Sequence, residues 1–262
     1  MQNKLNKLYE QYNRREYIHP DPLEFLYNYE HLRDREIAGL IASSLAYGKV
    51  AQILKSVSRV LEIMGESPFN YLCSTSESEI LLHFQSFVHR FAKGKHLSAL
   101  LIGIKHVIAG YGSIYNCFID GYDSFDETIV PALTVFSKKI IAVSDGCSPG
   151  HLMPCPDKGS ACKRLNLYLR WMIRKDDVDP GGWQGISASK LIVPLDTHMF
   201  RISGKMGLTA RRQANLKTAI EITEGFKQWS PADPVRYDFA LTRFGIRNDL
   251  AGNEALRNQL GI

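Results

Sequence analysis

Two side chains in the second half of the chain have the types and spacing for covalent chemistry on a sugar. Lys163 follows a turn of small residues at the start of a helical run. Asp196 stands further along, where the apolar segment 191–195 gives way to another helical run. An uncharged amine can attack a sugar carbon, and a nearby carboxylate can take up its proton and stabilise the positive charge that develops. The pattern therefore favours a nucleophile–carboxylate pair, provided that the fold brings the two side chains together.

Simpler interpretations of the same residues stay open. Lys163 also suits a solvated lysine on the polar face of a helix, and Asp196 also suits a plain N-cap, which stabilises a helix by about 1 kcal/mol. His198 fits a packed or surface histidine, because no partner at metal-ligand spacing accompanies it. Trp171 fits a ring packed between helices.

Composition limits the classes of protein that fit. The 262 residues are 45% hydrophobic and 23% charged, as in an ordinary globular protein. Residues 151–262 carry 17 Lys and Arg against 11 Asp and Glu, whereas residues 1–150 carry 15 against 16. The first of these regions would attract a polyanion. No apolar run is long enough to cross a bilayer and the N-terminus lacks a signal-peptide core, so we expect a cytoplasmic location.

The five cysteines argue against three kinds of cysteine framework. Their number is odd and no CxxC pair is present, which disfavours disulfide scaffolds, zinc ribbons and iron–sulfur loops. We therefore expect free thiols, no metal and no cofactor.

Turn signals fall at helix-sized intervals, and few stretches alternate as strands do, so the sequence predicts an all-α fold. A short helix after the Asp21-Pro22 start and a loop over 144–157 are expected. The longer predicted helices are 1–14, 34–45, 50–64, 79–92, 97–109, 125–142, 161–174, 197–206, 211–229 and 235–244, the last one ending at Gly245.

Three segments carry a resemblance to a known family. Residues 159–169, GSACKRLNLYL, resemble the end of the hairpin and the second helix of the helix-hairpin-helix DNA glycosylase superfamily, to which endonuclease III belongs. Residues 193–201, VPLDTHMFR, resemble that family's segment around its essential Asp, and residues 237–245 are similar to the helix that follows. The long interval between Lys163 and Asp196 is similar to the archaeal branch that removes 8-oxoguanine. The chain also resembles an uncharacterised bacterial family of this superfamily.

The resemblance covers about residues 34–250 and departs from the family at two points. The usual Leu-Pro-Gly-Val-Gly consensus reads DKGSA at 157–161, so one glycine stands in place. No cysteine follows Cys162, so the iron–sulfur cluster of endonuclease III is excluded here.

The resemblance implies roles for particular residues. Lys163 would be the Schiff-base nucleophile and Asp196 its acid–base and electrostatic partner. Tyr47 falls where the family places a loop that fills the gap left by an extruded base. The residues implied in DNA binding are Gly159, Ser160, Ala161, Tyr47, Arg164 and Arg201, and those implied in the base pocket are Asp238, Phe239 and Leu167. Asp238 also suits a surface carboxylate, and Tyr47 also suits ordinary core.

The resemblance further implies a fold of two helical lobes with the active site in the cleft between them. We expect a helical barrel over 34–175, including the hairpin at about 150–174, and a second lobe from 1–33 and 185–262. The implied function is a bifunctional DNA glycosylase/AP lyase for an oxidised base, with 8-oxoguanine as a candidate. Duplex DNA would be the partner of a nucleoid-associated monomer. Two alternatives stay open, a helical DNA-binding module that has lost the chemistry and a helical protein-interaction scaffold.

Overall fold

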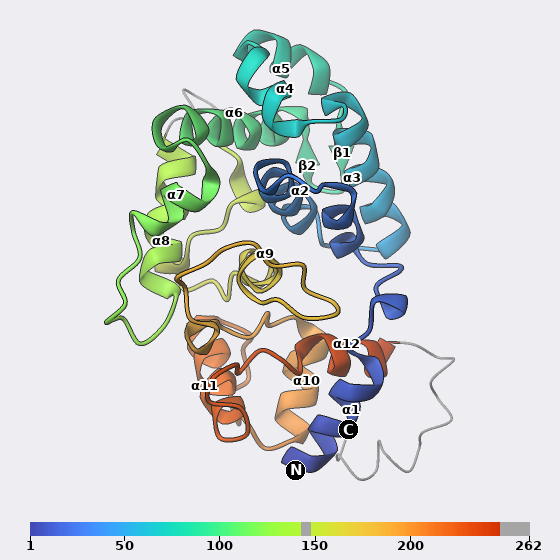
Figure 1. Cartoon of the computed structure of the whole chain (residues 1–262), viewed down its shortest axis with the longest axis vertical. Coiled ribbons are helices and arrows are strands. Elements are labelled where there is room, and N and C mark those ends of the chain that lie inside the picture. Colours follow the sequence, from blue (N-terminus) through green and yellow to red (C-terminus); the bar gives the residue numbers. More distant parts are fainter. Residues whose placement is uncertain (143–147, 247–262) are drawn as a thin grey trace. The chain divides into compact units, whose positions relative to one another are not determined.

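The computed structural model describes residues 1–142 and 148–246, which fold into two compact units. Unit 1 combines Met1–His19 with the chain from Lys158 onward, and unit 2 is Pro20–Asp157. Both units are built mainly from helices, as Figure 1 shows, so the all-α prediction is confirmed. Positions 144–147 of the predicted loop, Cys147 among them, and the end of the predicted second lobe from 247 lie outside the described residues.

Unit 2 is organised around its longest helix, α6 (Gly94–Tyr111), whose side chains are buried around most of its circumference. Helices from both sides in sequence contact it, and Gly103 lets α8 come close, because a Cβ there would lie 2.5 Å from the carbonyl oxygen of Ile140. The remaining elements of this unit are η2 (Pro22–Asn28), α2 (Leu32–Ser44), α3 (Val50–Met64), α4 (Pro68–Ser74), α5 (Glu77–Phe84), β1 (Val88–His89), β2 (Ala92–Lys93), α7 (Ile114–Ile119), α8 (Val130–Ala142), η3 (Gly150–Leu152) and η4 (Pro156–Lys158), whose last residue begins unit 1.

The predicted helix over 79–92 is wrong in its second half. Helix α5 begins with a capping box between Ser76 and Glu79 but ends at Phe84, and an antiparallel hairpin of β1 and β2 follows. The reason is a buried long-range contact. His89 is fully buried, with its Nδ1 2.8 Å from the Ser56 hydroxyl and its Nε2 3.1 Å from the Tyr47 carbonyl oxygen. A continuing helix could not place His89 there, and periodicity does not contain this information.

Unit 1 packs the N-terminal helix α1 (Gln2–Tyr12) against the C-terminal helix α12 (Asp238–Ile246), which lie side by side in Figure 1. The rings of Tyr12 and Phe244 are 5.9 Å apart in this contact. Helix α12 continues through Gly245, so the predicted stop there is wrong. The other elements are η1 (Arg15–Tyr17), α9 (Lys163–Ile173), η5 (Ala188–Lys190), α10 (Thr197–Lys205) and α11 (Leu216–Lys227).

The apolar segment 191–195 is a buried stretch of unit 1 that forms neither helix nor strand. The Val193 N–H in this stretch donates to the Thr223 hydroxyl of α11 at 3.0 Å. Because the segment is buried and directly precedes α10, it fixes the position at which Asp196 begins that helix.

The two units divide the chain differently from the lobes expected from sequence. Residues 158–174 belong to unit 1, whereas the expected barrel included them, and residues 20–33 belong to unit 2. The physical reason for the first difference is a set of buried ion pairs that join α9 to residues 176–238. For the second, Leu23 and Leu26 of η2 are fully buried and η2 contacts α2.

Candidate functional site

Lys163 is the first residue of α9, and a constrained turn sets its position. Cys162 precedes it as the N-cap in a left-handed conformation with φ +46°, and its side chain makes no capping hydrogen bond. Two local hydrogen bonds hold the turn, from Cys162 N–H to the Ser160 hydroxyl at 3.2 Å and from Asn166 Nδ2 to the Ala161 carbonyl at 2.9 Å. Gly159 is tied to α11, because its carbonyl accepts from Leu216 N–H at 3.0 Å. The start of α9 is therefore fixed from both sides of Lys163.

Asp196 is the N-cap of α10, as the sequence predicted. Its Oδ1 accepts a hydrogen bond from Met199 N–H at 2.8 Å, so one carboxylate oxygen secures the helix. The other oxygen, Oδ2, lies 3.9 Å from the Nζ of Lys163. The capping bond thus fixes the carboxylate while leaving one oxygen for the lysine.

The pair is close but not tight. Its 3.9 Å separation lies beyond ordinary hydrogen-bond length, and the two side chains remain 28% and 36% exposed. Both residues belong to unit 1, although the lobes expected from sequence placed them apart. An amine and a carboxylate that are near each other and open to solvent can exchange a proton and admit a ligand. The expected cleft between lobes stays a prediction.

Two buried arginines follow Lys163 along the chain, Arg170 within α9 and Arg174 at its C-cap, and both bind carboxylates. Arg170 contacts Asp238 through Nη1 and Asp179 through Nε, the latter at 3.2 Å. Arg174 contacts Asp179, and it also binds Asp176 at 2.7 Å and Asp233 at 2.9 Å. Both arginine side chains are 4% exposed and the Asp179 side chain is fully buried. We call these six side chains the buried ion network: Arg170, Arg174, Asp176, Asp179, Asp233 and Asp238.

Asp238 connects the network electrostatically to the candidate pair. Burial raises the pKa of Asp238 to about 6, the Arg170 guanidinium opposes this rise, and the charges of Asp196 and Lys163 act on the same carboxyl in opposite directions. Three carboxylates and two cations therefore form one set of interacting charges. They are Asp238, Asp196, Asp179, Lys163 and Arg170. The charge on Asp238 near neutral pH affects the field that Lys163 experiences.

The residues implied in a base pocket differ in their exposure. Leu167 is partly exposed one helical turn after Lys163. Asp238 and Phe239 are 5% and 2% exposed, and Phe239 lies 4.8 Å from the Arg243 guanidinium. The structure therefore places these two in the interior, where arginines contact them.

The residues implied in DNA binding lie in both units. Arg201 is exposed on α10, with Nη2 3.4 Å from His198 Nδ1, and Arg164 is partly exposed on α9. Gly159 is exposed, whereas Ala161 is buried. Tyr47 belongs to unit 2, where its hydroxyl donates to the His89 carbonyl at 2.8 Å. Their roles in DNA binding stay predictions.

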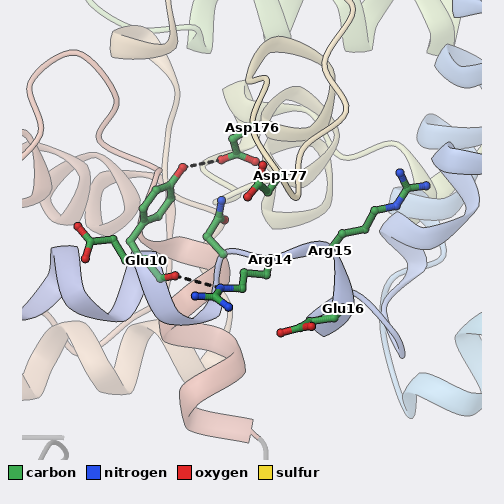
Figure 2. Close-up of a pocket in the computed structure, with 8 residues that line it drawn as sticks. Glu10, Arg14, Arg15, Glu16, Asp176 and Asp177 are labelled. Atoms are coloured by element: carbon green, nitrogen blue, oxygen red, sulfur yellow. Dashed lines mark hydrogen bonds between the residues drawn. The ribbon is translucent and has the colours of Figure 1, made fainter.

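An open pocket of about 690 Å³ in unit 1 was not foreseen from the sequence. Figure 2 shows Asp176 and Asp177 on one side of it and Arg14 on the other. Asp176 is held by Tyr9, whose hydroxyl donates at 2.9 Å, and by Arg174 of the buried ion network. Burial and the adjacent Asp176 raise the pKa of Tyr9 to about 12. The tyrosine therefore stays a hydrogen-bond donor at neutral pH.

Sequence reasoning missed the buried ion network as a unit. The signal was present, because Lys163, Arg170 and Arg174 recur on one face of the predicted helix 161–174. A row of basic residues normally indicates a solvated helix face. Arg170 and Arg174 are buried here because carboxylates from residues 176–238 pair with them.

Two absences concern residues 1–142 and 148–246, the part of the chain that the structure describes. No three His, Cys, Asp or Glu side chains in these ranges gather as a metal site. None of the helices found there is long and apolar enough to span a membrane.

Comparison with known proteins gives one match. The model of the family described as "Protein of unknown function (DUF2400)" matches residues 21–247. No curated protein and no solved structure matches the chain.

Proposed function

We propose that this chain, which belongs to the DUF2400 family of unknown function, is a DNA glycosylase/AP lyase with Lys163 as nucleophile and Asp196 as its partner. One observation carries the proposal, the 3.9 Å approach of Lys163 Nζ to a carboxylate whose other oxygen is anchored by a backbone N–H. The sequence resemblance around both residues supplies the reaction class.

The proposed reaction begins with proton transfer from the Lys163 ammonium to Asp196 Oδ2, which leaves a neutral amine. Its lone pair attacks C1′ of the damaged nucleotide while the C1′–N bond breaks, and the departing base takes the proton that Asp196 had received, which returns Asp196 to its ionised form. The ionised carboxylate stabilises the positive charge on the sugar. Opening of the sugar ring gives a protonated Schiff base, and loss of a C2′ proton then expels the 3′ phosphate. The 3.9 Å separation suits an enzyme without substrate, since catalytic hydrogen bonds tighten in the complex.

Borohydride trapping tests the proposal directly. Reduction of the Schiff base would join the chain covalently to duplex DNA that carries 8-oxoguanine or an abasic site. We expect an adduct with the unchanged protein and none with Lys163→Gln. Lys158→Gln is the matched control, because Lys158 is an exposed lysine close in sequence that the mechanism does not use.

Asp196→Asn separates the charge from the cap. Asn is as good an N-cap as Asp, so the variant keeps α10 in place but cannot accept the ammonium proton. We expect the rate of adduct formation to fall by roughly 100-fold or more, as general-base removal does. An equal adduct yield from Lys163→Gln and the unchanged protein would refute the proposed nucleophile.

A non-catalytic DNA-binding module is the second candidate, and the partial exposure of the pair also suits a surface ion pair. That function gives salt-sensitive DNA binding, unchanged in Lys163→Gln, without any adduct. A protein-interaction scaffold gives no DNA binding even at low salt.

A further inference from the structure

A surface of unit 2, at the tip of the β1–β2 hairpin, combines an exposed aromatic ring with cations. We call it the hairpin-tip surface and define it by Arg90, Phe91, Lys93, Lys95 and His96. Phe91 is 71% exposed, and Val88 on the neighbouring strand is 64% exposed. Large apolar side chains at the tip of a short hairpin add little to a core. The exposed Phe91 ring together with the basic residues near it is instead consistent with a binding surface.

The Phe91 ring is in contact with the side chain of Arg90. The Arg90 guanidinium carbon lies 5.4 Å from the centre of the Phe91 ring. Arg90 itself has a left-handed backbone with φ +53°, and its side chain runs over Gly48, where a Cβ would lie 2.7 Å from Arg90 Cδ. The glycine thus leaves room for the arginine to lie beside the ring.

Ring contacts and hydrogen bonds of Tyr47 and His151 hold the hairpin in place. Tyr47 donates to the His89 carbonyl, and its hydroxyl is also 2.9 Å from His151 Nε2. The exposed His151 ring is 6.5 Å from Phe91 and 6.3 Å from His96. The hairpin is therefore anchored, and the exposed Phe91 ring stands at the edge of a larger aromatic group.

The charged residues in the sequence segments that form this surface are all basic. Residues 80–119 contain no Asp or Glu, and neither do residues 37–61, which supply Gly48 and Tyr47. Partial burial lowers the pKa of His96, and the charges of Lys95 and Lys93, which lie just after β2 and in it, lower it further. A second exposed ring in the same unit gives the opposite case, since Phe125 is 93% exposed between Asp123 and Asp126. Phe91 therefore has the Arg90 guanidinium beside it and lysines close in sequence, whereas Phe125 has acidic neighbours in sequence.

We propose that the hairpin-tip surface binds single-stranded nucleic acid, with a base stacked on Phe91 and the adjoining phosphates bound by Arg90, Lys93 and Lys95. Aromatic rings accept the face of any base, while cations follow the backbone, which is how sequence-tolerant single-strand binding works. This surface lies wholly in unit 2 and needs no chemistry from Lys163, so it extends beyond the proposed function.

Fluorescence anisotropy with a labelled thymidine oligonucleotide of about 12 nucleotides tests the proposal on the full chain. Loss of one stacked base weakens binding roughly 5- to 150-fold, so we expect at least a five-fold weaker affinity for Phe91→Ala. Phe91→Trp should retain binding. Phe125→Ala is the matched control and should bind as the unchanged protein does. Both phenylalanines are exposed, and circular dichroism checks that each variant folds.

Salt dependence tests the phosphate contacts separately. Lys93→Gln should reduce the slope of log affinity against log salt by about 0.7, the value for one phosphate contact on a single strand. Equal affinities for Phe91→Ala and Phe125→Ala would overturn the proposal. So would Phe91-dependent binding to phosphatidylserine vesicles without oligonucleotide binding, which would assign the surface to a membrane.

The two proposals fail separately. Oligonucleotide binding that persists in Lys163→Gln supports the hairpin-tip surface whether or not trapping succeeds. An adduct that forms equally well with Phe91→Ala supports the Lys163 chemistry without the surface.

Discussion

Helix α9 carries two kinds of contact between a cation and a carboxylate, and they differ in nearly every physical respect. At its N-terminus, Lys163 approaches Asp196 to 3.9 Å and both side chains are partly exposed. Further along, Arg170 within α9 and Arg174 at its C-cap are buried, and each contacts more than one carboxylate. One helix therefore places an open pair and a closed network next to each other.

The difference separates reactivity from structure. Exposed pairs stabilise a protein by about 0–1 kcal/mol, so the pair at Lys163 contributes little to folding. A lysine can lose its proton and attack a substrate, whereas an arginine remains charged and binds carboxylates through a rigid fork. The buried ion network has the properties of a support, and the open pair has those of a reactive site. Three substitutions, taken from the largest expected effect to the smallest, would sharpen or break this comparison.

Asp179→Ala should have the largest effect. The fully buried carboxylate contacts both arginines, and its removal leaves their charges partly uncompensated. We expect a loss of roughly 3–5 kcal/mol in the free energy of unfolding, measured by urea denaturation. Asp177→Ala is the control, since this neighbouring side chain is exposed and should change stability by no more than about 0.5 kcal/mol. Equal effects from the two variants would show that the network is not a support.

Asp238→Asn should change how stability depends on pH. The pKa of Asp238 is about 6 in the folded protein against 3.8 for the ordinary carboxyl, so the folded state binds the proton more tightly. Its contribution is fully present below about pH 4 and is lost as pH rises through 6, by up to roughly 3 kcal/mol. Urea unfolding from pH 4 to pH 8 should therefore show a fall that is smaller in the variant. Parallel curves for the two proteins would contradict the shift.

Asp196→Ala should have the smallest effect on stability, a loss of about 1 kcal/mol from the missing cap of α10. Asp196→Asn should retain that stability because its side chain still accepts from Met199 N–H. Thermal unfolding of both variants measures the difference. If both were equally destabilised, the charge next to Lys163 would contribute to folding and the pair would resemble the network.

Local signals in the sequence were sufficient for several elements. Helical spacing predicted α3 at its observed bounds, and it placed Lys163 at the start of α9. The Asp-Pro and Asp-Thr starts predicted caps by Asp21 and Asp196, both of which accept backbone hydrogen bonds. These features depend on hydrogen bonds and side-chain periods within a few residues, which is why one segment of sequence contains them.

The sequence by itself determined a helical protein with a lysine and a capping aspartate at two helix starts. The tertiary structure alone decided that Lys163 Nζ and Asp196 Oδ2, at these two starts, lie 3.9 Å apart within one unit. It also decided that His89 is buried against Ser56, so that a hairpin with Phe91 at its tip follows α5 in place of further helix. The reason is the range of the forces involved. Helix periodicity and capping act between neighbours in the chain, whereas burial of Arg170, Arg174 and His89 requires partners that are distant in sequence and meet only on folding.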